Sequence, residues 1–342
     1  MTTATRLLDE LCHLTAQSLT SLNPSDHFQV IKLLGEGSYG KVMLAMHKKR
    51  GTPMALKFFP RDSTSLFSFL REYNLSLAYC THPSLTSALG IAFSTPTHYV
   101  FAQQPSLYGD LYDVIVPEVG LEECCVQRVV SQISGALSYL HTLGFAHRDV
   151  KPENIFLCDR DCRWVKLGDF GMVKAVGTRV PCVWYSSPYC TPEAEIAREK
   201  ELSDSGSPSV DENGNKSKEG SQKTTKKRIL VSVEVSTDSW ALGILIYAML
   251  MGSLPWSESV LDNVAYERYF RWSERGRMQT EDSESDGLED FYYVAPQFTA
   301  FTPLACSLFR ALLHPKPNLR ATPGEVAAYL GGAWLLSSDI SG

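Results

Sequence analysis

The hydrophobic pattern of this chain changes its period near residue 120, and that change limits the possible folds more than any other feature. Up to residue 102 the pattern is strand-like over residues 28–60 and 89–102, with a helix-compatible segment at 66–79. Later, the apolar residues of 125–144 and 237–252 recur at helical spacing. Strands first and helices later predict an α+β protein with two unequal lobes. The small lobe, antiparallel and β-rich, is expected over 28–104, and the larger, mainly helical lobe over 105–332.

Three segments fall outside this pattern. Residues 1–27 form an N-terminal segment whose leucines share one helical face, so we expect a short amphipathic helix, packed on the domain or partly frayed. The leucines are Leu7, Leu8, Leu11 and Leu14. Residues 198–228 contain almost no bulky apolar side chain and predict a disordered insertion, because such a segment cannot bury enough surface to offset its ordering entropy. Residues 333–342 are expected to form a short C-terminal tail.

Composition argues against several classes of function. The 342 residues carry a formal net charge of -6, which gives no sign of nucleic-acid binding. Asp9 and Glu10 lie where a secretory signal would be apolar, and the longest apolar run, 240–251, is too short to cross a bilayer. We therefore expect no membrane insertion and a cytoplasmic location, with access to the nucleus left open. The nine cysteines are then expected to be reduced, and Cys158 and Cys162 lack the second ligand pair of a zinc site.

One charged string, HRDVKPEN at residues 147–154, carries the most information about function. It resembles the catalytic loop of protein kinases, HRDxKxxN, and the length of the match disfavours the alternative of an ordinary charged turn. The resemblance implies that Asp149 orients the substrate hydroxyl and accepts its proton. Lys151 would neutralise charge on the transferred phosphoryl group, and Asn154 would hold a magnesium ion.

The tripeptide Asp169-Phe170-Gly171 follows fifteen residues after Asn154. Alone it would indicate no more than a turn. After HRDVKPEN it matches the kinase motif whose aspartate chelates the magnesium that bridges the phosphates of ATP. Asn154 and Asp169 are therefore the expected metal ligands.

A glycine-rich segment between the first two predicted strands is the candidate phosphate-binding loop. Its GxGxxG spacing is equally typical of a tight hairpin turn, but a strand follows where a dinucleotide-binding fold requires a helix. Glycines would let backbone amides approach phosphate oxygens closely. The expected nucleotide-binding residues here are Leu34, Gly35, Glu36, Gly37, Ser38, Tyr39, Gly40 and Val42.

Lys57 lies between apolar residues on the third predicted strand, where a buried lysine would need a partner. ATP phosphates and a glutamate of the helix at 66–79 would supply one, and Glu72 is the candidate. A surface lysine at a strand end is the alternative.

The resemblance covers roughly residues 28–332, and GTPMALK, YGDL and VKPEN place it nearest to the SH3-binding kinase family. It implies the bilobal protein-kinase fold with ATP bound between the lobes. Further expected nucleotide contacts are Ala55 and Val42 above the adenine, Phe156 below it and Gln104 in the hinge between the lobes.

In the larger lobe, the resemblance implies an ion pair between Glu193 of the sequence TPE and Arg320. It also implies that Asp238 of DSWALG accepts backbone amides of the catalytic loop, and Thr237 is a plausible cap for the helix that follows.

Three departures from the family pattern stand out. Cys182 lies where many kinases carry a phosphorylated threonine, although Arg148 is present, and Thr178 is the nearest threonine. The insertion lengthens the chain between TPE and DSW. None of the 18 prolines forms a PxxP pair, so binding to SH3 domains is not supported.

The residues together predict a serine/threonine protein kinase that uses ATP and Mg2+ to phosphorylate protein substrates. Lys151 after Asp149 is the serine/threonine pattern, and Ser186 lies where such kinases place a hydroxyl that bonds the catalytic aspartate. The alternative is a pseudokinase, a nucleotide-binding scaffold without phosphotransfer, which intact Lys57, Asp149 and Asp169 disfavour. Cys182 further suggests activity without phosphorylation of the activation segment, the stretch after Asp169.

Overall fold

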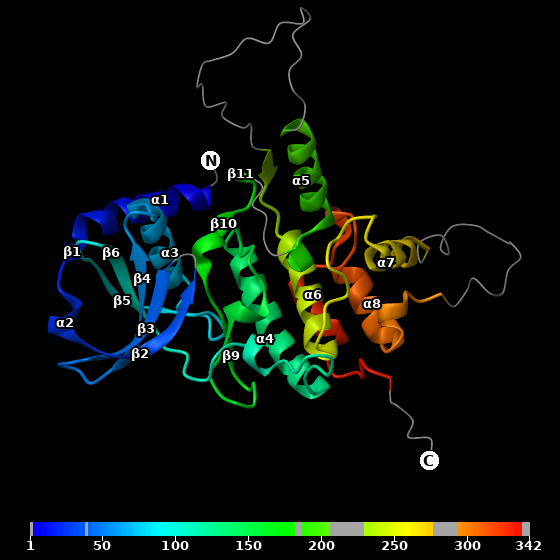
Figure 1. The fold of residues 1–342 in the computed structure, drawn as a ribbon, viewed down its shortest axis with the longest axis horizontal. Helices are drawn as coiled ribbons and strands as arrows, with labels where there is room; N and C mark the ends of the chain where they lie inside the picture. Colours follow the sequence, from blue (N-terminus) through cyan, green and yellow to red (C-terminus); the bar gives the residue numbers. More distant parts are fainter. Residues whose placement is uncertain (1–2, 38–39, 182–186, 206–228, 276–292, 337–342) are drawn as a thin grey trace, which may run out of the picture.

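The computed structural model describes residues 3–37, 40–181, 187–205, 229–275 and 293–336. A β-rich lobe, blue to cyan in Figure 1, lies beside a helical lobe that runs from green to red. The predicted α+β fold with two unequal lobes is confirmed.

The smaller N-lobe is built on a six-stranded sheet. Its strands are β1 Thr20–Ser21, β2 Phe28–Gly37, β3 Gly40–His47, β4 Pro53–Pro60, β5 Ala88–Ser94 and β6 His98–Gln103. They lie in the order β1-β5-β6-β4-β3-β2. All neighbours from β5 to β2 pair antiparallel as predicted, whereas β1 pairs parallel to β5.

The two faces of this sheet bury different side chains because successive residues of a strand point to opposite sides. Leu56 and Val100 pack with Phe28 in a small core of the N-lobe. Phe59 and Phe101 belong to the main core, together with helix α3, Leu66–Ala78. The face that carries Phe59 is therefore the face on which α3 packs.

The N-terminal segment contains helix α1, Thr3–Ser18, and the short helix α2, Pro24–His27. The helix was expected, but the prediction of which face is buried is wrong. The buried apolar residues are Leu8 and Cys12, which are 4% and 1% exposed. The three leucines on the exposed side are Leu7, Leu11 and Leu14. Each residue turns the helix by about 100°, so the stripe that packs on α3 excludes the residues next to Leu8.

The larger C-lobe surrounds one buried helix. Its helices are α4 Glu123–Thr142, α5 Pro192–Ser205, α6 Ser236–Met251, α7 Val264–Arg275 and α8 Pro303–Leu312. Its short strands are β7 Phe145–Ala146, β8 Ile155–Leu157, β9 Val165–Leu167, β10 Lys174–Ala175, β11 Arg179–Pro181 and β12 Leu230–Ser232. Every residue of α6 from Asp238 to Leu250 is buried. Even so, no helix among the described residues is long and apolar enough to span a membrane.

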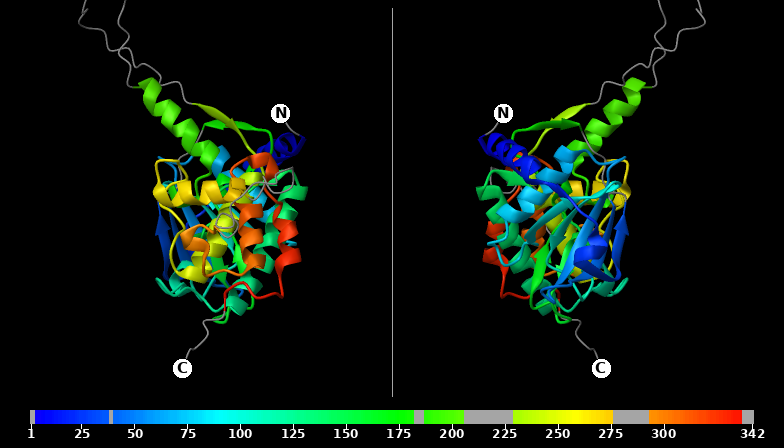
Figure 2. Two further views of the ribbon diagram at one scale, coloured as in Figure 1. Left: turned by 90° about the vertical axis from the view of Figure 1, so that its right-hand side faces the viewer. Right: turned by 90° about the vertical axis from the view of Figure 1, so that its left-hand side faces the viewer.

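The expected disorder of the insertion is wrong for residues 198–205, which continue α5. This helix projects from the C-lobe in both figures (Figures 1 and 2). The sequence REKEL consists of good helix formers, so a helix that begins at Pro192 can extend without apolar burial. Residues 206–228, the rest of the predicted insertion, lie outside the described residues.

The expected boundary of the C-terminal tail at residue 333 is also wrong. Trp334 is fully buried in the main core, and its indole Nε1 donates to the carbonyl of Tyr329 at 2.8 Å. Glu123, at the start of α4, accepts hydrogen bonds from the backbone amides of Trp334 and Leu335. The described residues after 332 are therefore part of the C-lobe.

Asp238, at the start of α6, fastens the loop that follows β7. Its carboxylate accepts backbone N–H groups of His147 at 2.8 Å and Arg148 at 2.7 Å, as predicted, and lies 2.8 Å from Nε2 of His141. Burial alone would raise the pKa of this carboxyl, but the hydrogen bond and charge of His141 and the nearby loop donors lower the pKa below its usual value. Thr237 does not cap the helix: the N-cap is Val235, two residues earlier, and it makes no side-chain capping bond.

We expect Asp238→Ala to lower the free energy of unfolding by about 3–5 kcal/mol, because it leaves buried donors without an acceptor. Urea unfolding at pH 7 measures the loss. Asp262→Ala, at an exposed aspartate, is the matched control and should change stability by about 0.5 kcal/mol or less. The depressed pKa means that the wild-type contribution is complete above the ordinary aspartate pKa of about 3.9 and is lost as the pH falls through the lower folded-state value. Equal effects of the two variants would contradict the anchoring role.

Candidate active site

Lys57, on β4, lies where three distant parts of the chain meet. Its Nζ is 2.6 Å from Oε1 of Glu72 on α3 and 3.1 Å from Oδ1 of Asp169, which follows β9. The side chains of Lys57 and Glu72 are only 12% and 8% exposed. The predicted contact between Lys57 and Glu72 is confirmed.

Regular secondary structure brings this pair together. Lys57 precedes Phe59 by two residues on β4, so both side chains point to the sheet face that α3 covers. On α3, Glu72 follows the buried Phe69 by three residues and therefore shares its inward face. The same hydrophobic contacts that dock α3 thus aim a carboxylate at the ammonium.

Lys57 and Asp169 stabilise each other's charged forms, whereas burial, together with the nearby charge of Asp169, raises the pKa of Glu72 above its usual value. Burial alone would lower the pKa of Lys57, but the carboxylates of Glu72 and Asp169 outweigh it and raise that pKa above its usual value. Burial alone would likewise raise the pKa of Asp169, and the charge and hydrogen bond of Lys57 lower it. At neutral pH an ammonium group therefore faces an ionised Asp169.

Asp169 occupies a strained turn. Its φ is +59°, in the left-handed region that non-glycine residues rarely adopt. The following Phe170 is 1% exposed and packs edge-on against Tyr79 and His147, which holds the turn in place. A side chain at Gly171 would come within 3.3 Å of Glu72 Oε2, so the glycine lets α3 approach closely.

Asp149 is held by two residues of its own loop. Its Oδ1 is 3.0 Å from Nζ of Lys151, and its Oδ2 accepts a hydrogen bond of 2.8 Å from the amide nitrogen of Asn154. The same nitrogen donates to the backbone carbonyl of Asp149 at 2.7 Å. The amide oxygen is the end of Asn154 that remains for a cation. The three predicted catalytic residues thus form one hydrogen-bonded group.

His147 joins this loop to the turn of Asp169. The ring is fully buried, accepts the backbone N–H of Asp149 at Nδ1, and has Nε2 3.1 Å from the carbonyl oxygen of Gly168. With Asp238 fixing the backbone of residues 147 and 148, the loop is tied to both α6 and the Asp169 turn.

The glycine-rich segment forms a β-hairpin, with Leu34, Gly35, Glu36 and Gly37 in β2 and Gly40 and Val42 in β3. Ser38 and Tyr39, at the predicted tip, lie outside the described residues. Gly40 has a φ of +132°, and a Cβ there would lie 1.9 Å from the carbonyl oxygen of Phe58. The hairpin therefore requires a glycine at position 40, because the backbone of Phe58 lies too close for a side chain. Phosphate binding by this segment stays a prediction.

The residues expected around the adenine lie on neighbouring elements. Val42 pairs with Lys57 across β3 and β4, and Ala55 pairs with Gln103 across β4 and β6. Gln104 follows β6, and its backbone N–H donates to Ser87 at 3.0 Å. Phe156 lies on β8 in the other lobe. Their contact with a nucleotide stays a prediction.

Glu193, at the start of α5, pairs with Arg320 through two short contacts of 2.8 and 2.6 Å. The guanidinium of Arg320 is fully buried and also donates to the backbone carbonyls of Ser236, His314 and Pro315. This fork geometry confirms the predicted pair and fastens the start of α5 to α6.

A cavity of about 340 Å³ opens beside Asp149 and Lys151. Its lining also includes residues of β11, β12, α6 and the first turn of α5. Apolar side chains there include Val180, Val231, Tyr189 and Ala241. Space next to the predicted catalytic base therefore exists on the C-lobe side.

Sequence reasoning missed three side chains near this site. His141 contacts Asp238, and a histidine in the last turn of a helix is the signal that could have drawn attention to it. Arg71 and Lys174 join Arg148 in what we call the basic cluster. Burial first, and then the charges of Arg71 and Arg148, lower the pKa of Lys174. Nothing in the sequence alone indicates that Arg71, Arg148 and Lys174 lie near one another.

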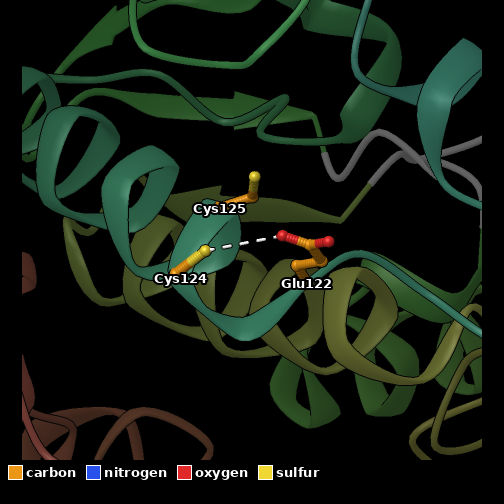
Figure 3. Close-up of side chains that lie close together, drawn as sticks. All are labelled: Glu122, Cys124 and Cys125. Carbon is orange, nitrogen blue, oxygen red and sulfur yellow. Dashed lines mark hydrogen bonds between the residues drawn. The ribbon is translucent and has the colours of Figure 1, made fainter.

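A second group of chemically capable side chains lies at the start of α4, away from Lys57. Glu122, Cys124 and Cys125 place their ligand atoms within 4.8 Å of one another (Figure 3). However, Nη2 of Arg128 lies 2.9 Å from the sulfur of Cys125, and burial raises the pKa of that thiol. A positive charge beside a protonated thiol opposes cation binding, so we assign no metal to this group.

Comparison with known proteins agrees with the geometry. The protein kinase domain family matches residues 28–206. Serine/threonine-protein kinase SBK1 of Danio rerio is 40% identical over 330 residues, which are 96% of this chain and 75% of that protein. The protein of the same name from Mus musculus is 35% identical, covering 95% of this chain and 68% of the relative. Serine/threonine-protein kinase SBK2 of Homo sapiens is 31% identical, covering 97% and 84%.

These matches run through both lobes and include the segments that carry Lys57, Asp149 and Asp169. With the hydrogen-bonded Asp149 loop and the Lys57–Glu72 pair, they show that the chain belongs to the protein kinase family, among relatives of the SBK group.

Proposed function

We propose that this protein transfers the γ-phosphoryl group of ATP to serine or threonine hydroxyls of protein substrates. The observation that carries the proposal is the position of Lys57, which contacts both Glu72 of the N-lobe and Asp169 of the C-lobe. In protein kinases this lysine–glutamate pair and the neighbouring aspartate must be in place together for phosphotransfer. The names of the relatives, all serine/threonine-protein kinases, support the same activity.

Each residue of the site has a distinct task in this proposal. Asp149 orients the acceptor hydroxyl and takes its proton as the oxygen attacks the γ-phosphorus and the bond to ADP breaks. Lys151, 3.0 Å from Asp149, keeps that carboxylate in position and offers positive charge to the transferred group. Lys57 holds the phosphates of the bound nucleotide.

The donor set fits a magnesium ion. Asp169 is ionised, and Asn154 is oriented by its two hydrogen bonds to Asp149, so a carboxylate oxygen and an amide oxygen are offered. Hard oxygen donors are the ligands that Mg2+ prefers. When bound, the ion would neutralise charge on the phosphate oxygens and align them with the acceptor.

Backbone hydrogen bonds hold the start of the activation segment. Backbone pairing between β11 and β12 joins Val180 to Val231, and further bonds link Gly177 and Thr178 to Val233. Arg148 donates to the carbonyl oxygen of Met172 at 3.3 Å. We infer that this ribbon orders the start of the segment where other kinases use a phosphorylated residue. Cys182 and Ser186 lie outside the described residues.

We expect Asp149→Asn to reduce kcat by roughly 10²–10⁴-fold while ATP affinity changes by about twofold or less. The carboxylate acts on the acceptor hydroxyl and not on the nucleotide. Phosphate transfer to generic protein substrates and binding of an ATP analogue are measured separately. Asp161→Asn, at an exposed aspartate, is the control and should behave as wild type. An unchanged kcat for Asp149→Asn would remove this residue from the mechanism, and an inactive wild type that binds ATP would indicate a pseudokinase.

Removal of divalent ions should abolish transfer, and added magnesium should restore it. Asp169→Asn should need a higher magnesium concentration for half-maximal rate, because it withdraws one charged donor. The ions are first removed with a chelator, and the rates of the two proteins are then compared as magnesium is added back. A full wild-type rate without any divalent ion would contradict the metal site.

Bacterially expressed enzyme treated with phosphatase should keep at least about half of its rate. The reason is that β12 already pairs with the start of the activation segment, and Arg148 already donates to the carbonyl of Met172. Mass spectrometry verifies that phosphate is absent. Thr178→Ala should have little effect. If treatment silences the enzyme and Thr178→Ala reproduces the loss, phosphorylation of Thr178 is required and this inference is wrong.

A further inference from the structure

Helix α1 lies across α3, the helix that supplies Glu72 to the active site. Figure 1 shows α1 in dark blue over the end of the N-lobe, beside α3, and Figure 2 shows the same relation from the side. Leu8 and Cys12 of α1 are buried in the main core with Phe69, Leu70 and Tyr73 of α3. This contact therefore belongs to the folded core and is not a loose association.

The polar contacts of α1 converge on the turn of α3 that carries Glu72. Asp9 Oδ1 is 3.7 Å from Nη1 of Arg71, the residue before Glu72. Thr15 Oγ1 donates to the side-chain oxygen of Asn74 at 3.0 Å, and the Asn74 amide nitrogen lies 3.7 Å from the sulfur of Cys12. Asn74 is only 6% exposed, so its side chain depends on these partners and on the carbonyl of Leu70.

The contact with Arg71 also has an electrostatic consequence. Arg71, Arg148 and Lys174 of the basic cluster come from α3, the catalytic loop and β10. Burial, and then repulsion by the charges of Arg71 and Arg148, lower the pKa of Lys174. Asp9 brings a carboxylate to within 3.7 Å of Arg71, on the face of α3 that α1 covers.

The helix reaches the other lobe as well. α1 contacts β10, and a Cβ placed on Gly144 after α4 would lie 3.8 Å from the Cβ of Ala4. Its N-terminal turns therefore touch the C-lobe, while Thr15 and Cys12 touch α3. One rigid helix thus links α3 to the strand that follows the Asp169 turn.

We propose that α1 is a built-in positioning helix for Glu72: it holds α3 against the sheet and, through Asp9, places a carboxylate beside Arg71 of the basic cluster. The proposal rests on the phosphotransfer activity proposed above and adds to it the element that keeps the Lys57–Glu72 pair assembled. Leu8, Cys12 and Asp9 act through α3 and do not touch the reacting atoms, so they are positioning residues.

The test compares two leucines of the same helix in the full-length protein. Leu8 is 4% exposed and Leu11 is 46% exposed, so Leu8→Ala loosens α1 from α3 and Leu11→Ala is the matched control. We expect Leu8→Ala to lower kcat roughly tenfold, about 1.4 kcal/mol in the barrier, with a smaller effect on KM for the protein substrate. Leu11→Ala should match wild type. Equal rates for the two variants would overturn the proposal.

A double-mutant cycle separates positioning from a general loss of stability. In a Glu72→Gln background the pair is already broken, so Leu8→Ala should cost less than about twofold further. The same tenfold loss in both backgrounds would show that α1 acts elsewhere and would overturn the proposal. In a second cycle, Asp9→Arg and Arg71→Asp should each lower the rate, and the double variant should recover at least half of the loss.

Hydrogen exchange gives a readout that does not depend on activity. Amides of residues 70–76 in α3 should exchange at least about tenfold faster in Leu8→Ala than in Leu11→Ala, because their helix is less restrained. Unchanged exchange would overturn the proposal about α1 even in an active enzyme. An inactive wild type whose α3 amides respond as expected would instead refute the proposed phosphotransfer and leave the restraint of α3 by α1 supported.

Discussion

A buried ammonium group requires negative partners, and in this protein the partners of Lys57 come from two other parts of the fold. Glu72 requires α3 to lie against the sheet, and Asp169 requires the C-lobe turn to come up beneath it. Leaving the ammonium unpaired at 12% exposure would carry a large desolvation penalty, so a conformation that separates the lobes or swings α3 outward is disfavoured in the absence of a replacement anion. The geometry of the candidate site therefore follows from satisfying one charge.

In the C-lobe, a buried negative charge likewise requires partners from other parts of the fold. Asp238 is a fully buried carboxylate at the start of α6, and it accepts backbone N–H groups of the loop that carries Asp149, with His141 of α4 as a further partner. Arg320 and Glu193 repeat the arrangement at the start of α5. Each buried charge ties a segment of irregular backbone to a regular helix. The loops can thus hold functional side chains in fixed positions even though they have little secondary structure of their own.

Two further elements contribute to the same arrangement. The ribbon of β11 and β12 pairs the activation segment with residues that follow the long insertion, and α1 brings Asp9 to Arg71. The first adds contacts to the start of the activation segment, and the second adds a contact to α3. Backbone pairing and a carboxylate are permanent features of the folded chain, whereas a phosphate must be added to the chain after synthesis. This arrangement is consistent with a kinase whose active geometry is built in during folding.

The sequence by itself determined the two-lobed α+β fold and the contacts of residues in strong motifs, such as Lys57 with Glu72 and Glu193 with Arg320. The fold follows from local periodicity, whereas these two contacts follow from the resemblance of the motifs to those of protein kinases. Only the tertiary structure decided that β1 pairs parallel, that the buried side of α1 is that of Leu8, and that β12 pairs with β11. A helix with apolar residues on several sides, or a three-residue strand, has no local preference among partners. Its position is set by the surface that the rest of the chain leaves for it, which appears only when the fold is complete.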